Sequence, residues 1–342
     1  MPNLTAAAIY CGGGGPLLGA REAGFELVFG IEPRNFFHPA TIDLNFPGMP
    51  FSRDIHAFRN KKVDLLIGQP PCARYSLLNR TKTRLDLYAT NPHKVEYTAF
   101  LKEVQKRKPE FFILENLPRI RNFLFFSYNP EDPTFRVHYY DSKTDQMETK
   151  PVLRLEGYKI YQYVIDTVEV GLPQLRKRLY IVGMKEKYPW NFEKPKVARQ
   201  RTLGPAIRNI PADDANHQKE TLSEKDLELW KRLKYLERSS INKKVRKMGP
   251  KIPCKTIVSA AIRFFHWSEQ RYLTPRECLR IQGFPDTYIA CGSINQQLNT
   301  AGKAVSPRVI EYLAKAVYNN IILQQEKSKT AMLLGGLLHA HQ

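Results

Sequence analysis

Short apolar runs alternate with amphipathic stretches along the first 120 residues of the chain. This alternation is typical of βαβ units, in which helices connect parallel strands and cover the sheet that they form. The pattern predicts buried strands at residues 5–10, 26–31, 63–67 and 111–114, and helices at 17–23, 40–45 and 95–106. The sequence therefore predicts an α/β fold with a mostly parallel sheet.

The rest of the chain predicts fewer regular elements. Residues 158–168 and 179–183 predict two further strands, which can run antiparallel to each other, and the alternation at 135–140 suggests a hairpin or flap within the polar stretch 127–150. We expect a charged helix at 221–239. A helical stripe of apolar residues at 307–323 needs a core to cover it. After Gln324 we expect a frayed tail.

The composition is that of an ordinary soluble globular protein, with 42% hydrophobic and 25% charged residues. A chain of 342 residues can bury an α/β core and still carry a smaller second domain. We find neither an apolar run long enough to span a membrane nor a secretion signal. The five cysteines lie far apart, so we expect no disulfide framework, no metal site and a cytoplasmic location.

A formal net charge of +20 is the first indication of function. So basic a surface repels itself unless it meets a polyanion, and nucleic acid is the commonest polyanion in a cell. Residues 231–251 hold nine Lys or Arg against one acid, Glu237. Such a run is either a solvated face or a contact with phosphates, and the overall charge favours the phosphate contact.

A run of four glycines, residues 12–15, follows the first predicted strand and precedes a helix. Glycines there let the backbone approach a ligand closely. Glu32 closes the next strand, where a carboxylate can accept hydrogen bonds from ribose hydroxyls. The run does not match G-x-G-x-x-G, because Leu17 or Leu18 stands at the third glycine position. An adenosine ligand without a pyrophosphate therefore fits better than a dinucleotide of an oxidoreductase.

Two predicted strands each end in a reactive side chain. The strand before residue 68 continues through Gln69-Pro70-Pro71 to Cys72, and two prolines in succession hold that thiol in place. The strand at 111–114 leads to Glu115, whose pKa burial would raise. Open α/β sheets bind ligands at the carboxyl ends of their strands. Further on, alternation puts Arg176 and Arg178 on the same side of a strand.

In this order, the segments resemble the cytosine C5 DNA methyltransferases of bacterial restriction–modification systems. The resemblance covers residues 8 to about 323, apart from 127–150 and most of 185–253. Six motifs carry it: the glycine-rich motif from Tyr10 to Gly19, Pro-Pro-Cys72-x-x-Tyr-Ser76, Glu115-Asn116-Leu117, Gln174-x-Arg176-x-Arg178, the R-x-L-T-x-R-E-x-x-R-x-Q-G-F-P of 271–285, and Gly302-Lys303-Ala304-Val305-Ser306-Pro307.

The resemblance implies a Rossmann-like, S-adenosylmethionine-dependent methyltransferase fold with a small target-recognition domain. Residues 1–184 would form the catalytic and cofactor-binding domain and 185–265 the target-recognition domain. Residues 266–325 would return to the catalytic domain, and 326–342 would be a tail. The implied partner is duplex DNA, with a separate cognate endonuclease possible. We expect a monomer in the cytoplasm, at the nucleoid.

The resemblance also implies the mechanism. Cys72 attacks C6 of a cytosine flipped out of the duplex, and a protonated Glu115 assists at N3. Arg176 and Arg178 complete the catalytic set, with Arg178 at the base carbonyl. S-adenosylmethionine gives its methyl group to C5 and becomes S-adenosylhomocysteine, without a metal.

Two further sets of residues follow from the resemblance. The cofactor set is Tyr10, Gly12, Gly14, Gly15, Glu32, Asp54, Ile55, Pro71, Lys303 and Ala304. The DNA set is Ser76, Lys243, Lys244, Arg246 and Arg263, and His266 and Trp267 are further candidate base readers.

The chain departs from the family pattern at four positions. Ala73 follows the nucleophile where glutamine is usual, Gln69 stands where glycine commonly precedes Pro-Pro, Lys303 replaces asparagine, and Ala8 replaces an acid or serine. None of these removes a group that the covalent mechanism requires. An RNA cytosine methyltransferase, a catalytically weakened nucleic-acid-binding homologue and a nucleotide-dependent oxidoreductase remain as alternatives.

Overall fold

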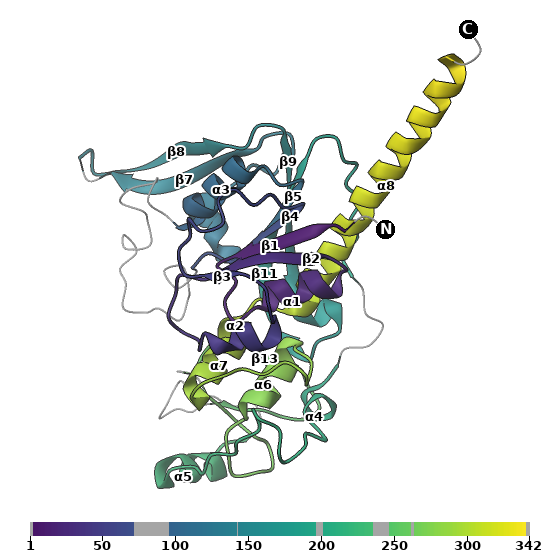
Figure 1. The fold of residues 1–342 in the computed structure, drawn as a ribbon. Coiled ribbons are helices and arrows are strands. Elements are labelled where there is room, and N and C mark those ends of the chain that lie inside the picture. Colours follow the sequence, from purple (N-terminus) through teal and green to yellow (C-terminus); the bar gives the residue numbers. More distant parts are fainter. Residues whose placement is uncertain are drawn as a thin grey trace.

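The computed structural model describes residues 3–71, 96–141, 143–195, 201–234, 246–260 and 263–339. A seven-stranded sheet forms its centre, in the order β3–β2–β1–β4–β5–β11–β9 (Figure 1). Strands β3, β2, β1, β4 and β5 are parallel, and β11 and β9 are antiparallel to their neighbours. The bounds are β1 Thr5–Ile9, β2 Glu26–Ile31, β3 Phe51–Ser52, β4 Leu65–Gly68, β5 Phe111–Asn116, β9 Tyr158–Asp166 and β11 Lys177–Lys185. The predicted α/β class with a mostly parallel sheet is confirmed.

Alternate residues of the central strands enter two separate cores, one on each face of the sheet. Ala6 and Ala8 of β1 belong to the core beneath α1 (Gly15–Glu22) and α8 (Pro307–His339). Ala7 and Ile9 belong to the core beneath α3 (Glu96–Arg107). Because both faces are covered, the central strands are apolar throughout rather than alternating.

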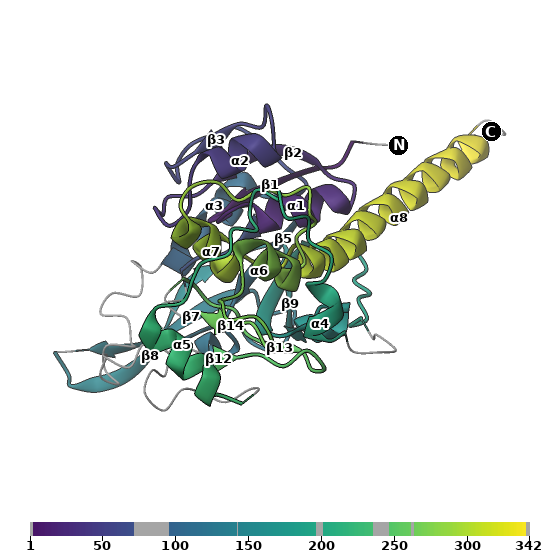
Figure 2. The ribbon, with the colours of Figure 1, turned by 90° about the horizontal axis from the view of Figure 1, so that it is seen from below.

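Helix α8 confirms the predicted apolar stripe, since Val309, Ile310, Leu313, Val317 and Ile321 are all buried. These side chains pack on the face of the sheet that α1 also covers, and the two helices lie side by side (Figures 1 and 2). The glycine at position 19 permits this approach, because a methyl group there would press against Ile310 of α8.

The predicted frayed tail after Gln324 is wrong as to secondary structure. The helix continues to His339 and projects away from the rest of the molecule (Figures 1 and 2). Residues 324–334 contain no proline or glycine and are mostly Gln, Glu, Lys, Ala, Met and Leu. These are strong helix formers, so the backbone can extend the helix beyond the buried stripe.

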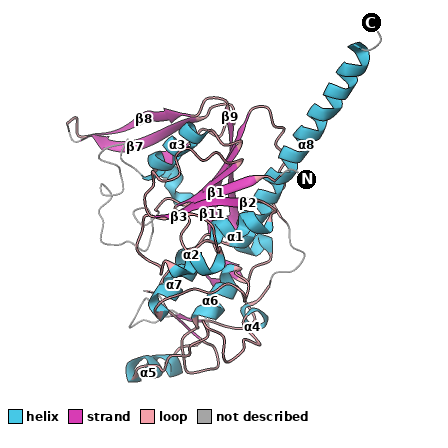
Figure 3. Ribbon diagram, in the orientation of Figure 1, coloured by secondary structure: helices cyan, strands magenta, loops and turns pink. Residues whose placement is uncertain are grey.

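The predicted hairpin within 127–150 is confirmed as part of a three-stranded antiparallel sheet, β6 (Leu124–Phe125), β7 (Thr134–Asp141) and β8 (Gln146–Arg154). It extends beside α3 at one end of the molecule (Figure 3). The predicted antiparallel pair is also confirmed, because β9 pairs with β11 along its whole length. Two 3-10 helices, η4 (Pro118–Asn122) and η5 (Thr167–Val170), lie in the connections.

Below the large sheet lies a lobe of short elements (Figure 1). Part of it shares the main core, because Leu203 and Ile257 belong to the same cluster as Ile67 of β4. A smaller core of Leu222, Leu229, Leu233 and Phe265 lies under α5. The elements of the lobe are α4 Leu203–Ala206, α5 Glu224–Arg232, α6 Pro275–Gln282, α7 Ile294–Lys303, the pair β10 (Gln174–Leu175) with β13 (Cys254–Lys255), and the pair β12 (Arg246–Lys247) with β14 (Phe264–Phe265). A helix of six residues, α2 (Ala40–Asn45), connects β2 with β3.

The charged helix predicted at 221–239 is shorter in the structure. It begins after Ser223, whose hydroxyl accepts a hydrogen bond from the backbone N–H of Asp226 and caps the helix. It ends at Leu233, whose backbone is extended and whose side chain enters the small core of the lobe. Residues 235–239 lie outside the described chain. None of the described helices combines the length and the apolarity that crossing a bilayer requires.

Candidate active site

Three strand ends meet at one edge of the central sheet. Ile9 of β1 pairs with Gly68 of β4, and Gly68 pairs with Leu114 of β5. Because the three strands are parallel, the glycine-rich loop after β1, the Pro-Pro segment after β4 and the carboxyl end of β5 come together there. The strand pattern predicts that the strands before Cys72 and Glu115 end at the same edge, and the register of β4 and β5 confirms this.

Glu115 is the acid at this edge. Its side chain is almost completely buried, and Nε of Arg178 lies 3.2 Å from its Oε1. Burial raises the pKa of Glu115 above its ordinary value, whereas Arg178, Arg176 and Arg34 oppose that rise. The Arg178 contact is not a directed hydrogen bond, and Oε1 has no hydrogen-bond partner. The carboxyl group therefore has an acceptor position, and when protonated a donor, to offer a ligand.

Asn116 ties the end of β5 to the Pro-Pro segment. Its side-chain amide donates a 3.0 Å hydrogen bond to the carbonyl oxygen of Pro70. Pro71 is half-buried, and the described chain stops there. The predicted nucleophile Cys72 and the predicted DNA contact Ser76 therefore lie outside the described residues, as does Ala73.

The two arginines of the Gln174 motif have different surroundings. Arg178 contacts Glu115, as described above. Arg176 is buried, and its guanidinium donates to the carbonyl oxygens of Ile257 and Ala304 at 2.8 and 2.9 Å. Arg176 therefore joins the sheet to the returning segment 302–307, and its charge acts on Glu115 from nearby.

The glycine-rich loop packs on two sides, and the glycines differ in what they face. Methyl groups added at Gly14 or Gly15 would overlap Phe46 or the carbonyl oxygen of Val305, so these two glycines allow the loop to pack against the protein. A methyl group at Gly12 would lie 3.6 Å from Oε1 of Gln69 and 3.7 Å from the ring of Phe36. Among the three predicted cofactor glycines, Gly12 is therefore the one with room beside it.

The backbone of the loop is strained where it faces that space. Tyr10 and Gly12 both have positive φ, of 59° and 57°. A tyrosine rarely adopts this left-handed conformation, and such residues cluster at ligand sites. The Tyr10 side chain is buried, which raises its pKa to about 12 and keeps the phenol neutral.

Glu32 lies beside Gly12 and is fully buried. Its Oε2 accepts a 2.7 Å hydrogen bond from the Gly12 N–H, and its two oxygens accept the Arg34 guanidinium at 2.6 Å each. The Arg34 backbone N–H is a fourth donor to this carboxylate. A carboxylate offers about four acceptor positions, so ribose hydroxyls can bind Glu32 only where the Arg34 guanidinium gives way.

The remaining predicted cofactor residues, Lys303, Ala304, Ile55 and Asp54, have different surroundings. Nζ of Lys303 lies 4.5 Å from the centre of the Phe36 ring, beside Gly12. Ala304 is buried, and its carbonyl oxygen accepts a hydrogen bond from Arg176. Ile55 is half-buried. Asp54 is exposed, and its carboxylate accepts the backbone N–H of His56, which fixes the turn after β3.

Sequence reasoning missed three residues of the site. Arg34 and Phe36 follow Glu32 closely but belong to no motif, and their positions depend on how the chain turns after β2. Gln69 departs from the family pattern in the sequence, but only the structure shows that its side chain lies beside Gly12 and Glu115.

The candidate base readers of the lobe have partners within the protein. Arg263 forms an ion pair with Glu220, and its guanidinium lies 4.1 Å from the ring centre of Tyr272. His266 stacks on Trp267, and its Nδ1 accepts the backbone N–H of Glu269. Burial lowers the pKa of His266 to about 4, so this ring is neutral at physiological pH. Arg246 lies in β12, whereas Lys243 and Lys244 lie outside the described residues.

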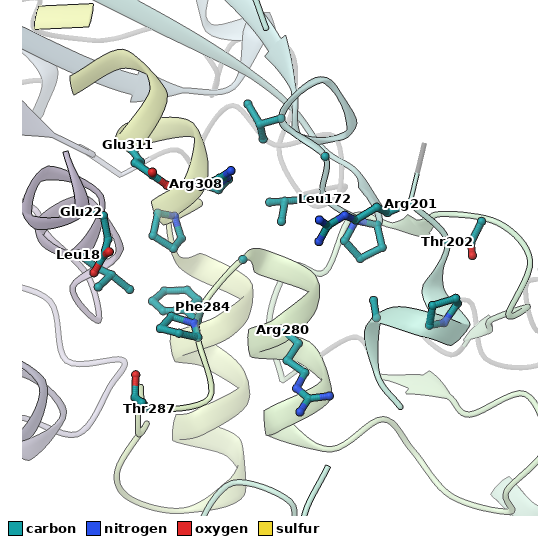
Figure 4. A pocket seen from close by; sticks show the side chains of 18 residues that line it. Leu18, Glu22, Leu172, Arg201, Thr202, Arg280, Phe284, Thr287, Arg308 and Glu311 are labelled. Atoms are coloured by element: carbon teal, nitrogen blue, oxygen red, sulfur yellow. Dashed lines mark hydrogen bonds and ion pairs between the residues drawn. The ribbon is translucent and has the colours of Figure 1, made fainter. Parts of the chain in front are cut away.

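An open cavity of about 1090 Å³ lies elsewhere on the molecule, between α1, α6 and α8 (Figure 4). Two of its cations have carboxylate partners, because Arg280 pairs with Asp286 and Arg308 with Glu311. None of the predicted site residues lines this cavity. We therefore place the candidate active site at the strand edge and not in this cavity.

Comparison with known proteins agrees with this arrangement. The family model described as C-5 cytosine-specific DNA methylase matches residues 4–319. The type II methyltransferase M1.HphI of Haemophilus parahaemolyticus is 27% identical, over 92% of this chain and 87% of the relative. The type II methyltransferase M.HaeII of Haemophilus aegyptius is 28% identical, over 98% of this chain and 99% of the relative.

Solved structures show the same fold. A prophage-encoded Escherichia coli protein described as a DNA modification methyltransferase is 21% identical with a TM-score of 0.68, and the match covers 93% of this chain and 99% of that one. The DNMT2 of Spodoptera frugiperda is 15% identical with a TM-score of 0.59, over 92% of this chain and 99% of that one. At these identities the likeness concerns the fold alone.

Proposed function

Because this chain belongs to the C-5 cytosine-specific DNA methylase family, we propose that it acts through a covalent Cys72 intermediate on a cytosine flipped out of duplex DNA. The family and the type II relatives establish the coarser statement, that it is a DNA cytosine-5 methyltransferase of the restriction–modification type. The finer proposal assigns chemical roles to this chain's own residues.

Attack on C6 is the first step. Carbon 6 of cytosine is a poor electrophile, so the Cys72 thiolate forms its bond to C6 only as negative charge on the ring is stabilised. Glu115 is suited to that task, since burial raises its pKa and favours the protonated carboxyl. A protonated Glu115 donates to N3, and the electron pair displaced from the C5–C6 double bond makes C5 nucleophilic. That pair forms the new bond to the methyl carbon at C5, while the bond between that carbon and the sulfonium sulfur breaks and the departing sulfur keeps its electron pair.

Completion of the reaction restores the ring. A base removes the C5 proton, the electrons of that C–H bond re-form the C5–C6 double bond, and sulfur leaves as the Cys72 thiolate. The N3 proton returns to Glu115. Arg178 holds the Glu115 carboxyl in place at 3.2 Å and, from the same strand edge, can reach the base carbonyl. Arg176 holds the segment 302–307 against the site through Ala304.

S-adenosylmethionine is the cofactor that the family uses, and when bound it supplies an electrophilic methyl group on a sulfonium. The residues present fit such a molecule. Gly12 has room beside it, Phe36 offers an apolar wall, and the buried Glu32 offers acceptors for ribose hydroxyls once the Arg34 guanidinium moves. The Gly12 loop lies at the same strand edge as Glu115, so this site adjoins the site of the base.

Recognition of DNA belongs to the same proposal. The target atom is inaccessible inside a duplex, so the base must leave the stack at a cost of a few kcal/mol. We assign phosphate contacts to the basic run 231–251, and base reading to a target-recognition domain formed by residues 185–265. We further propose that the protein acts as a monomer at the cytoplasmic nucleoid, and that any cognate endonuclease acts separately.

One observation carries the proposal: a buried acid with a raised pKa lies at the strand edge to which the Pro-Pro-Cys72 segment leads. The test uses duplex DNA with 5-fluorocytosine at the target base, together with S-adenosylmethionine. Fluorine replaces the proton whose loss releases sulfur, so the covalent adduct persists and survives denaturing electrophoresis. Bisulfite sequencing of DNA from cells that express the chain identifies the target beforehand.

The wild-type protein should form the adduct, and Cys72→Ser should form none. Cys291→Ser is the matched control, because Cys291 is a half-buried free cysteine and should leave adduct formation unchanged. A wild-type protein without adduct would be a weakened homologue. Transfer of labelled methyl to tRNA and not to duplex DNA would instead indicate an RNA substrate.

A further inference from the structure

We propose that Gln69 is a positioning residue for the bound cofactor, and that its side-chain carbonyl oxygen faces the positively charged sulfonium end. This inference rests on the proposed function and adds a residue that departs from the family pattern. It depends on the contacts of one buried amide, which lies between the glycine-rich loop, the returning segment and the catalytic acid.

The orientation of the Gln69 amide is fixed by one hydrogen bond. Its Nε2 donates at 2.8 Å to the carbonyl oxygen of Lys303, which can only accept. The other end of the amide must therefore be the oxygen. That oxygen, Oε1, is buried and has no hydrogen-bond partner, and the side chain as a whole is only 7% exposed.

Oε1 is buried beside the glycine-rich loop, at Gly12. A methyl group at Gly12 would lie 3.6 Å from Oε1, with the ring of Phe36 at a similar distance. The oxygen therefore lies next to the loop residue that we assign to the cofactor site. A buried carbonyl without a hydrogen-bond partner destabilises the protein, so a ligand that brings a positive group to this oxygen recovers the lost free energy.

The position of Gln69 in the fold indicates which part of the cofactor its side chain would contact. Ribose belongs at Glu32, on the β2 side of Gly12. Gln69 lies on the other side, directly after β4, and its amide also acts on the charge of Glu115. The methyl group must reach a base held by Glu115. The sulfonium therefore belongs near Gln69, where the amide dipole presents its negative end.

An unpartnered amide oxygen is not by itself a site, as Gln162 shows. Its Oε1 is also buried without a partner, while its Nε2 donates to the carbonyl oxygens of Phe126 and Ser127. Gln162 belongs to β9, the edge strand that β5 and β11 separate from β4, so it lies away from the glycine-rich loop. It therefore provides a matched control for Gln69.

The test measures binding of S-adenosylmethionine and S-adenosylhomocysteine by calorimetry, without DNA, to wild type, Gln69→Met and Gln162→Met. The two ligands differ in the methyl group and the positive charge on sulfur. Gln69→Met keeps the side-chain length but removes the oxygen. We expect it to weaken S-adenosylmethionine binding about tenfold or more and S-adenosylhomocysteine binding less than about threefold. Gln162→Met should change neither.

An equal loss for both ligands, or no loss for either, would overturn the inference. A second variant, Gln69→Leu, guards against a misfolded methionine variant, and urea unfolding without ligand shows whether each variant folds. Failure here is separable from failure of the proposed function, because the 5-fluorocytosine adduct reports on Cys72 and uses the wild-type protein.

Discussion

Nε of Arg178 lies 3.2 Å from Oε1 of Glu115, across the antiparallel strands β11 and β5. Burial and the Arg178 guanidinium act in opposite directions on the protonation equilibrium of Glu115. Burial raises the pKa of Glu115, and the guanidinium of Arg178 is the largest of the influences that lower it. The protonation state of the acid therefore depends on this one contact more than on any other charge near it.

The methyl-transfer rate should fall on the alkaline side as Glu115 loses its proton. Arg178→Met removes the main opposing charge, so the alkaline limb should move to higher pH, even though the maximal rate falls. Glu115→Gln should flatten that limb and reduce the rate by about 10² to 10⁴. Single-turnover rates between pH 6 and pH 9 measure both effects. An alkaline limb that stays in place in Glu115→Gln would assign it to another group.

The same shift predicts a pH dependence of stability. A carboxyl whose folded pKa is raised stabilises the fold fully below its unfolded pKa of about 4.3, and that contribution is lost as pH rises through the folded pKa. Glu115→Gln does not titrate, so its stability relative to wild type should improve as pH rises. Urea unfolding at several pH values measures this difference. A difference that is constant with pH would contradict the prediction.

Two arginines on α6 should differ greatly in their effect on stability. Arg276 is 1% exposed, and its guanidinium contacts the Asp214 carboxylate and the carbonyl oxygens of Pro285 and Tyr288. Arg280, one turn later, pairs with Asp286 at a partly exposed site. Arg276→Met leaves buried acceptors unpaired and should cost about 3–5 kcal/mol. Arg280→Met should cost about 1 kcal/mol or less.

Urea unfolding of the two variants under one set of conditions provides the comparison. A similar loss of unfolding free energy in both variants would contradict the prediction. It would mean that the cost of burying the Arg276 charge offsets the stabilisation from its contacts. The sequence alone showed both arginines in one motif and gave no reason to separate them.

Much of the site was predictable because strand order and register follow from the apolar pattern. The runs that became β1, β4 and β5 are buried on both faces, so their periodicity and their ends are visible in the sequence. Since parallel strands end at a common edge, the glycine-rich loop, the Pro-Pro segment and Glu115 could be brought together without coordinates.

The parts that could not be predicted depend on contacts distant in sequence or on side-chain conformation. Gly15 packs against Val305, 290 residues later, and no local pattern reveals that approach. The Arg34 guanidinium donates hydrogen bonds to both oxygens of Glu32, and this depends on the rotamer of the Arg34 side chain. Alternation predicts Arg176 and Arg178 on the same side of the strand, yet Arg176 binds the carbonyl oxygen of Ala304, which lies 128 residues later in the chain.

Gly12 and Gly15 should respond differently to alanine. At Gly15 a methyl group would overlap the backbone oxygen of Val305, which cannot move without shifting the start of α8. Gly15→Ala should therefore lower the free energy of unfolding by about 1–3 kcal/mol. At Gly12 the methyl group has room, but it enters the cofactor space and φ is positive. Gly12→Ala should cost about 1 kcal/mol of stability and weaken S-adenosylmethionine binding more than tenfold.

Both glycine variants need two measurements, urea unfolding without ligand and calorimetric binding. If Gly12→Ala binds S-adenosylmethionine as the wild type does, the space beside Gly12 is not the cofactor site. That result would leave the assignment of Gly15 to packing untouched, because Gly15 is tested by stability alone.

The affinity for duplex DNA should fall steeply with salt if the basic run 231–251 lies along phosphates. Each phosphate contact contributes about 0.9 to the slope of log affinity against log salt concentration, so Lys243→Gln with Lys244→Gln should reduce the slope by nearly two. Lys327→Gln with Lys329→Gln is the matched control. It removes the same charge from exposed positions on the projecting half of α8.

Fluorescence anisotropy of a labelled duplex between about 50 and 200 mM salt measures these slopes. The control pair should leave the slope nearly unchanged, since only phosphates in contact release counterions. Equal effects of the two pairs would mean that net charge alone attracts DNA. A slope unchanged by neutralising Lys243 and Lys244 would mean that these two side chains face solvent, and phosphate contacts would then have to come from elsewhere in the chain.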